Sequence, residues 1–106
     1  MNLHLHLEQL SNPEPIREAC TQQATELNAD FPETTRVSVT VHRVGAEYET
    51  HVCANGKDVE VASRARDTEI LGSVTDAFDK TRRQLRKNHD KTIFVRRREA
   101  QRSSHR

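Results

Sequence analysis

Several residue types that mark common protein classes are scarce in this sequence. Its 106 residues contain no Trp, one Tyr, three Phe, three Gly and two Cys. Two cysteines cannot form a disulfide framework, and Cys20 and Cys53 lack CxxC spacing, so we expect free thiols in a reducing compartment. No apolar run approaches the ~20 residues that span a bilayer, and the N-terminus has no basic leader. The sequence therefore predicts a cytoplasmic protein that does not use a membrane.

The shortage of glycine also excludes a glycine-rich phosphate loop, since the glycines are widely separated. Gly45 and Gly56 have the surroundings of turn residues. An enzyme would need a nucleophile and a base, or converging carboxylates, in a cleft. His51 and Cys53 share one face of an expected strand, but a strand surface offers neither a pocket nor an oxyanion hole. We therefore expect no enzymatic activity, no cofactor and no small-molecule substrate.

Charge is abundant and unevenly distributed. Residues 1–60 carry 4 Lys and Arg against 10 Asp and Glu, whereas residues 61–106 carry 13 against 6. The two parts thus have net charges of −6 and +7, although the whole chain has only +1. Such asymmetry indicates a polyanion-binding end and an acidic remainder that limits unspecific association. At this length the chain forms one small domain.

Hydrophobic alternation predicts four strands. The apolar residues lie on one face of each strand, and the dipeptide Asn55-Gly56 is typical of a tight turn before the last strand. The predicted strands cover residues 2–7, 36–44, 45–54 and 57–63.

Helical spacing predicts two amphipathic helices, one within residues 11–31 and one from Thr68 to about Asn88, with Asp67 or Thr68 as the N-cap of the second. The element order is then β-α-β-β-β-α. One face of a four-stranded sheet carries the Val and Leu side chains, and both helices cover that face. The predicted fold is a two-layer α+β sandwich whose other sheet face meets solvent.

One side of the second helix is strongly basic. The stretch DKTRRQLRKNHDK, residues 79–91, contains six Lys and Arg. On a helical wheel the apolar stripe centres between Val74 and Phe78, and the cations lie on the remaining surface. Lys80, Arg83 and Lys87 project from the side opposite the apolar stripe. Arg82 and Arg86 project from one flank of the helix, and Lys91 projects from the other flank.

Two interpretations of this basic side are open. It is a solvated helix face, helped by the preference of cations for a helix C-terminus, or it binds phosphates. The charge asymmetry and the Arg-rich end of the chain favour a phosphate-binding surface. Because exposed aromatic residues are nearly absent, stacking on single-stranded bases is disfavoured, and structured RNA recognised by its shape fits better.

The end of the chain lacks apolar periodicity. We therefore expect a folded domain over residues 1–91 and a basic, disordered tail over residues 92–106. The tail either keeps the protein soluble or adds RNA contacts through Arg96, Arg97 and Arg98.

Histidines gather on the solvent face of the predicted sheet. His4 and His6 share a strand face, and His42, His51 and Cys53 point to the same side. A metal site or a pH-sensitive contact is conceivable there. The HxH pattern alone is weak, however, and we expect solvated histidines and no bound metal.

The stretch DKTRRQLRKNHDK resembles the DKLxRQLxKxKxK run of the bacterial hibernation promoting factor and ribosome-associated inhibitor family. The element order agrees, as does the segment HVCANG, which is similar to the family's VHVNGG-like turn, with a weaker match at residues 16–18. The resemblance covers residues 1–91, with its specific part in 52–91. Thr81 stands where the family has Leu, and His89 where it usually has Lys.

The resemblance implies a fold like that of double-stranded-RNA-binding domains. It also implies a protein that docks between the head and body of the small ribosomal subunit, over the tRNA and mRNA sites, and holds ribosomes inactive during stress or stationary phase. The family's conserved basic positions correspond to Lys80, Arg83, Lys87 and Lys91, as contacts to ribosomal RNA. The expected partners are the small subunit and its RNA, and we expect a monomer when the protein is free. The dimerisation domain of the family's long form has no counterpart, so ribosome pairing through it is not expected.

Two other functions fit the same residues. A protein-interaction or regulatory module would use the acidic first half of the chain as its working surface. A generic structured-RNA-binding protein would use the basic helix without preferring ribosomes.

Overall fold

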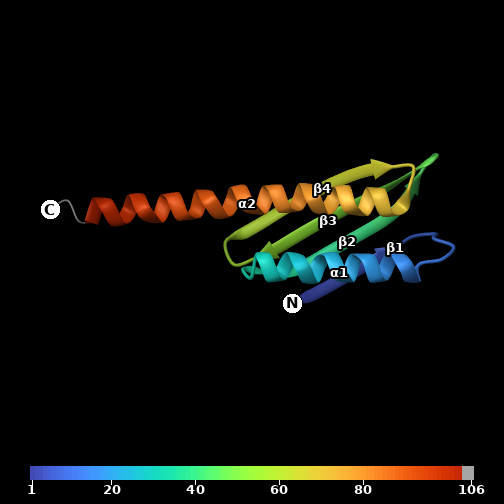
Figure 1. The fold of residues 1–106 in the computed structure, drawn as a ribbon, viewed down its shortest axis with the longest axis horizontal. Coiled ribbons are helices and arrows are strands. Elements are labelled where there is room, and N and C mark those ends of the chain that lie inside the picture. The colour runs from blue at the N-terminus through green and yellow to red at the C-terminus, as the bar shows by residue number, and fades with distance from the viewer. Residues whose placement is uncertain (104–106) are drawn as a thin grey trace.

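The computed structural model describes the backbone of residues 1–103 and the side chains of residues 1–88. Its elements follow the order that the hydrophobic pattern predicts (Figure 1). They are β1 (Asn2–Leu7), α1 (Glu14–Asp30), β2 (Thr34–Val44), β3 (Glu47–Gly56), β4 (Val59–Asp67) and α2 (Ile70–Ser103). The predicted β-α-β-β-β-α fold of the α+β class is therefore confirmed.

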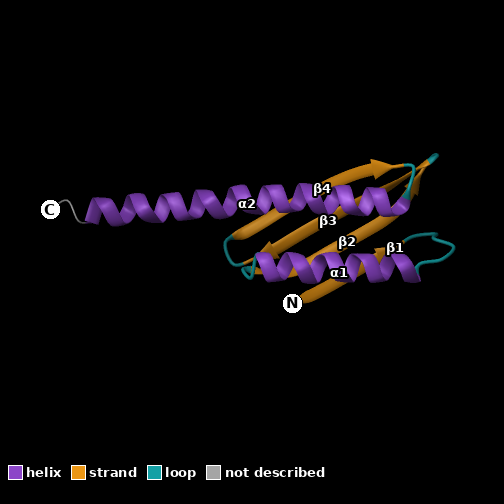
Figure 2. Cartoon of the chain, viewed as in Figure 1, coloured by secondary structure: helices purple, strands orange, loops and turns teal. Residues whose placement is uncertain are grey.

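The strands form one sheet in the order β1-β2-β3-β4. β1 is parallel to β2, because α1 carries the chain back between them, and β2, β3 and β4 form an antiparallel meander. Gly45 in the β2–β3 loop has a φ of +63°, a left-handed conformation that glycine adopts freely. Both helices lie on the same face of the sheet (Figure 2), α1 over β1 and β2 and α2 over β3 and β4. The opposite face is uncovered.

The core lies between the sheet and the helices. Val37, Val39 and Val41 alternate along β2 and expose at most 1% of their surface, and Phe78 on α2 is fully buried. This burial follows from the periods of two and 3.6 residues, which place the apolar side chains of each element on one face. Cys20 belongs to the same core, and burial raises the pKa of its thiol to about 11. The thiol is therefore protonated and unreactive at neutral pH.

The predicted turn at Asn55-Gly56 is wrong by two residues. The β3–β4 loop consists of Lys57 and Asp58, and Asp58 takes a left-handed φ of +62°. Asn and Asp tolerate this conformation better than other residues with side chains. Gly56 lies within β3, where a β-carbon would overlap the carbonyl oxygen of Glu33. This glycine therefore permits a close approach of two backbone segments and does not form the turn.

α2 is longer than the sequence suggested. The sequence predicts a helix end near Asn88, but the helical backbone continues to Ser103. The disorder of the tail over residues 92–106 stays a prediction, and residues 104–106 lie outside the described residues. No Gly or Pro follows Gly72, and Arg, Glu, Ala and Gln are good helix formers, so nothing in this stretch stops the helix. The expected boundary after residue 91 falls inside this helix. Within residues 1–103, no helix is long and apolar enough to cross a membrane.

α2 runs antiparallel to β4 and covers the outer edge of that strand. The Lys80 ammonium donates to the carbonyl oxygen of Arg64 at 3.0 Å, and the Gln84 amide donates to the carbonyl oxygen of Ala62 at 3.0 Å. Four residues of a helix and two residues of a strand each span about 6 Å along their axes. Residues four apart on α2 can therefore contact residues two apart on β4. Because β4 begins at Val59, three residues before Ala62, α2 passes the end of the sheet about two turns after Gln84 and continues beyond it (Figure 1).

Candidate nucleic-acid interface

The rotation of α2 about its axis is fixed by the residues that it buries. Val74, Phe78 and Leu85 expose no more than 1% of their surface, as the predicted apolar stripe required. Thr81 lies on the same stripe and is fully buried, and its hydroxyl donates to the carbonyl oxygen of Ala77 at 2.9 Å. The side chain at this position is thus tolerated in the core because its polar group is satisfied within the helix. The opposite side of α2 must face solvent.

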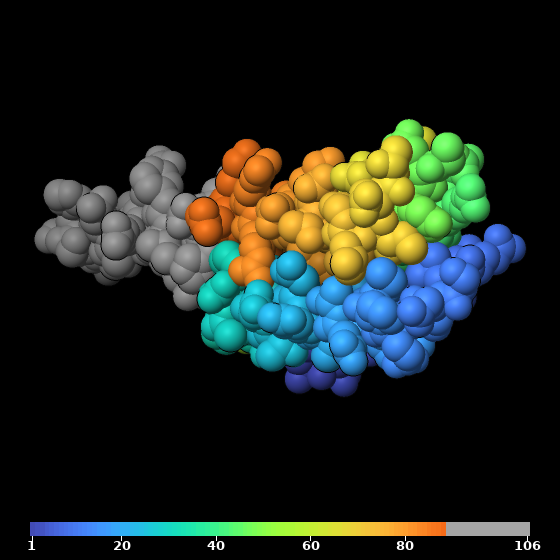
Figure 3. Space-filling model, turned by 45° about the vertical axis from the view of Figure 1, so that its right-hand side comes forward, coloured from blue at the N-terminus to red at the C-terminus, as the bar shows by residue number. Residues whose placement is uncertain are grey.

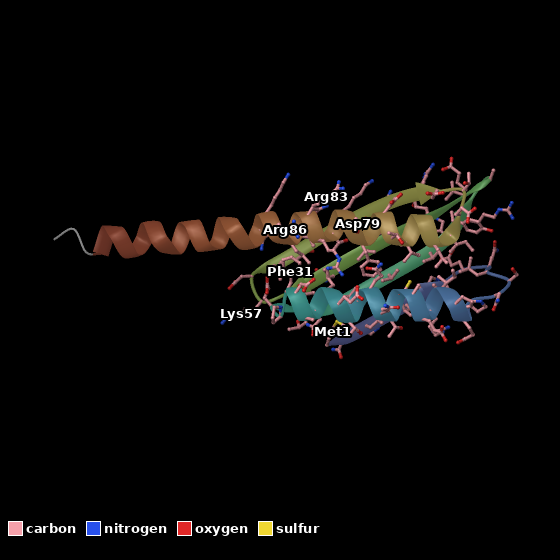
Figure 4. All side chains as sticks on the ribbon, in the orientation of Figure 1. Met1, Phe31, Lys57, Asp79, Arg83 and Arg86 are labelled. Atoms are coloured by element: carbon pink, nitrogen blue, oxygen red, sulfur yellow. The ribbon has the colours of Figure 1, made fainter. Side chains whose placement is uncertain are left out.

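Four predicted contact residues lie on that solvent side. Arg83, Arg86 and Lys87 are exposed, and within residues 1–88 none of them takes part in an ion pair. Arg83 and Arg86 follow Asp79 along α2 (Figure 4). Lys80 is also exposed, and its bond to the β4 carbonyl holds its ammonium at the junction of helix and sheet. The structure therefore brings these four cations together on one rigid helix.

Arg82 has different surroundings from its neighbours. Its side chain is only 22% exposed, and its guanidinium lies 2.8 Å from the Asp30 carboxylate and 3.6 Å from the Glu26 carboxylate, both on α1. The two helices lie directly against each other in the space-filling view (Figure 3). Arg82 therefore joins α2 to α1, and its role as an RNA contact stays a prediction from the sequence.

The remaining predicted contacts lie outside the residues whose side chains are described. They are Lys91, Arg96, Arg97 and Arg98, and their positions as RNA contacts stay predictions.

Sequence reasoning missed two further cations, Arg64 and Arg66 on β4. Their side chains are 64% and 56% exposed and lie on the uncovered face of the sheet. The signal was present in the segment SRARD, in which the arginines alternate with the buried Ala65. The predicted strand ends at residue 63, whereas β4 continues to Asp67 and includes both arginines.

A buried carboxylate lies between these arginines. Glu49 on β3 exposes 6% of its surface, and its carboxylate accepts a hydrogen bond of 2.7 Å from Arg66 Nε. Arg64 Nε and His42 Nε2 lie 3.9 and 3.5 Å from the same carboxylate. The hydrogen bond from Arg66 is the main cause that lowers the pKa of Glu49, and it outweighs the opposing effect of burial. Glu49 is therefore ionised at neutral pH and holds Arg66 in place.

The histidines lie on the uncovered sheet face, as predicted, but they are spread across it. His6 is paired with Thr40 on β2, which in turn is paired with His51 on β3, so the two imidazoles lie two strands apart, about 9–10 Å at the backbone. The thiol of Cys53 is 3.7 Å from His51 Nε2. Among the residues with described side chains, no three His, Cys, Asp or Glu are grouped so that they could hold a metal ion.

Comparison with known proteins agrees with this fold. A family model described as Sigma 54 modulation protein / S30EA ribosomal protein matches residues 3–93. No curated protein matches the chain at a significant level. The fold is similar to a ribosomal subunit interface protein from Coxiella burnetii, with a TM-score of 0.77, 12% identity, and coverage of 85% of this chain and 99% of that one. It is also similar to the N-terminal domain of Thermus thermophilus Protein Y, with a TM-score of 0.73, 16% identity, and coverage of 82% and 98%. At these identities the two structures establish the fold alone.

Proposed function

The chain belongs to the Sigma 54 modulation protein / S30EA ribosomal protein family, and from this membership we propose that it inhibits translation by occupying the small ribosomal subunit. The family consists of ribosome-binding factors and is not known as an enzyme family. In this proposal the protein covers the tRNA and mRNA sites and contacts ribosomal RNA. It acts by occupancy, so it needs no catalytic group and no cofactor.

The observation that carries the proposal is the exposed cationic side of α2. Arg83, Arg86 and Lys87 have no ion-pair partner within residues 1–88, although the chain has nearly as many acidic as basic residues. Cations that are not neutralised internally release counterions when they meet RNA phosphates, which is favourable. The helix is anchored by its buried stripe, so these charges keep a fixed spacing. Fixed spacing suits recognition of a folded RNA by shape.

The first prediction tests this surface with a charge-matched pair of variants. The triple variant Arg83→Glu/Arg86→Glu/Lys87→Glu should lose co-sedimentation with small ribosomal subunits, because phosphates would face three carboxylates. A control variant, Arg17→Glu/Arg36→Glu/Lys57→Glu, changes the net charge equally at exposed cations on other elements. The control should keep most of the binding. Equal loss in both variants would show that only total charge matters and would contradict the proposed surface.

Competition separates the ribosome-specific function from general RNA binding. A ribosome-directed protein should stay bound to small subunits when an excess of free RNA duplex is added. Displacement by the duplex would instead support a generic structured-RNA-binding protein. Translation of a reporter mRNA in a bacterial extract gives the functional readout, and added protein should lower its yield.

A further inference from the structure

A cleft separates β4 from the exposed side of α2. Its volume is about 260 Å³, and charged side chains from both elements line it. The lining residues are Ala65, Arg66, Asp76, Asp79, Lys80 and Arg83. The cleft is therefore the place where the cations of the helix meet the cations of the strand.

Arg66 lines this cleft, and its orientation is fixed by a carboxylate on the neighbouring strand. Its Nε donates to the buried Glu49 carboxylate at 2.7 Å, while the side chain as a whole is 56% exposed. This bond uses only Nε, so the terminal NH₂ groups of the guanidinium are left to bind another acceptor. A guanidinium that is held in this way loses less conformational freedom when it binds an anion.

We propose that the cleft seats a phosphate of the bound RNA, with Arg66 from β4 completing a site that Lys80 and Arg83 begin on α2. This inference rests on the proposed function and extends the RNA-binding surface from the helix onto the edge of the sheet. Glu49 does not touch the RNA. It is a positioning residue that acts through Arg66.

The chemistry of the lining favours a single phosphodiester over other occupants. The volume of the cleft lies just below the ~300–1,000 Å³ typical of sites for drug-sized ligands, and five of its six lining residues are charged, whereas such sites are mostly apolar. Both properties favour a phosphodiester over a drug-sized molecule. Three cations face two carboxylates, which leaves one net positive charge. Asp76 and Asp79 precede Lys80 and Arg83 by four residues each, a helical spacing that places them beside these cations, although neither forms an ion pair with them within residues 1–88. The same carboxylates repel a phosphate, so neutralising one of them should tighten RNA binding if the cleft holds a phosphate.

The first experiment measures binding of small ribosomal subunits over a range of salt concentrations. Arg66→Gln should weaken binding and lower the magnitude of the log–log salt slope by about one, because one of the cation–phosphate contacts is lost. Arg17→Gln removes a half-exposed cation on α1 and is the matched control, which should change neither value. An Arg66→Gln variant that behaves like the control would overturn the proposal.

The second experiment uses the signs of three neutralising changes. Asp79→Asn should tighten binding, because it removes a negative charge from the cleft, and Glu18→Gln on α1 should have little effect. Glu49→Gln should weaken binding although it too removes a negative charge, because Arg66 loses its charged anchor. In an Arg66→Gln background the same Glu49 change should no longer weaken binding. If Glu49→Gln tightens binding in the Arg66 protein, the positioning role is wrong.

The outcomes separate this inference from the proposed function. If wild-type protein does not bind small subunits, the proposed function fails and the cleft has no RNA to seat. If wild-type protein binds and the α2 triple variant does not, but Arg66→Gln binds normally, the function holds and the cleft proposal is wrong. Melting curves of each variant establish that the fold is kept.

Discussion

At the scale of single residues, the role of a charged side chain depends on what the fold places beside it. Arg82 and Arg83 are neighbours in sequence, but one contacts Asp30 on α1 while the other faces solvent. The helical wheel separates flank from face. It does not show that α1 places carboxylates next to Arg82. That information requires the packing of two helices that are distant in sequence.

The second prediction concerns this pair of arginines. Arg82→Gln should lower the free energy of unfolding by about 1 kcal/mol, the upper range for a partly exposed ion pair, because the link from α2 to α1 is lost. Arg83→Gln should leave stability nearly unchanged and should weaken binding to small subunits more than Arg82→Gln does. Thermal melts and co-sedimentation measure the two effects. The opposite assignment of effects would mean that Arg82 is released from α1 when the protein binds.

The third prediction concerns the pH dependence of stability. The pKa of Glu49 is lowered from its ordinary value of 4.5 in the folded state. The unfolded chain therefore binds a proton first as the pH falls, so the stabilisation is complete above about pH 4.5 and is lost as the pH falls toward the lowered native pKa. Glu49→Gln removes this contribution. Urea unfolding of wild type between pH 6 and 3 should show a steeper loss of stability than unfolding of the variant, and parallel curves would contradict the lowered pKa.

At the scale of elements, the sequence predicts best where a single periodicity decides the structure. β1 has the predicted limits because Leu and His alternate without interruption. The two helices bury most of their predicted apolar stripes, but Leu71, which the helical spacing also places on the stripe of α2, is 49% exposed. The predictions fail where contacts that are distant in sequence decide. A glycine is required at position 56 because the carbonyl group of Glu33 leaves no room for a β-carbon. Arg66 on β4 is held in place by Glu49 on the neighbouring strand. Neither contact leaves a periodic signal in the sequence.

The fourth prediction tests the new role of Gly56. Gly56→Ala should lower the free energy of unfolding by roughly 1–3 kcal/mol, because the added β-carbon overlaps the backbone of Glu33 and one strand must move. The control is Gly45→Asn, at a position with left-handed φ and open space around it. Asn tolerates that conformation, so the control should lose little stability. If the two variants lose equal stability in urea unfolding, the close approach at Gly56 is not a constraint.

At the scale of the whole molecule, a nearly neutral protein can still bind a polyanion because its charge is divided between surfaces. The overall net charge of +1 gives no sign of this. The division arises because α1 places acidic residues beside α2, where Asp30 and Glu26 pair with Arg82 and with no other cation among the described side chains of α2. The other described cations of α2 stay available.

The fifth prediction follows from this division of charge. The affinity for small subunits should fall steeply with salt, with a log–log slope of magnitude roughly 4–5 if the four exposed cations of α2 and Arg66 each make one cation–phosphate contact. Titration at several concentrations of potassium chloride measures the slope. A response that is flat in salt would exclude docking driven by these charges.

The coverage of β4 by α2 has a further consequence for assembly. Lys80 and Gln84 occupy carbonyl groups along one border of the sheet, whereas β1 forms the other border with no strand beyond it in the described residues. Strand-to-strand association along β4 would therefore have to displace these two side chains, whereas β1 offers a border that needs no such displacement. Pairing along β1 would occupy this border in both copies, so association of this kind would stop at two copies and would not form a filament.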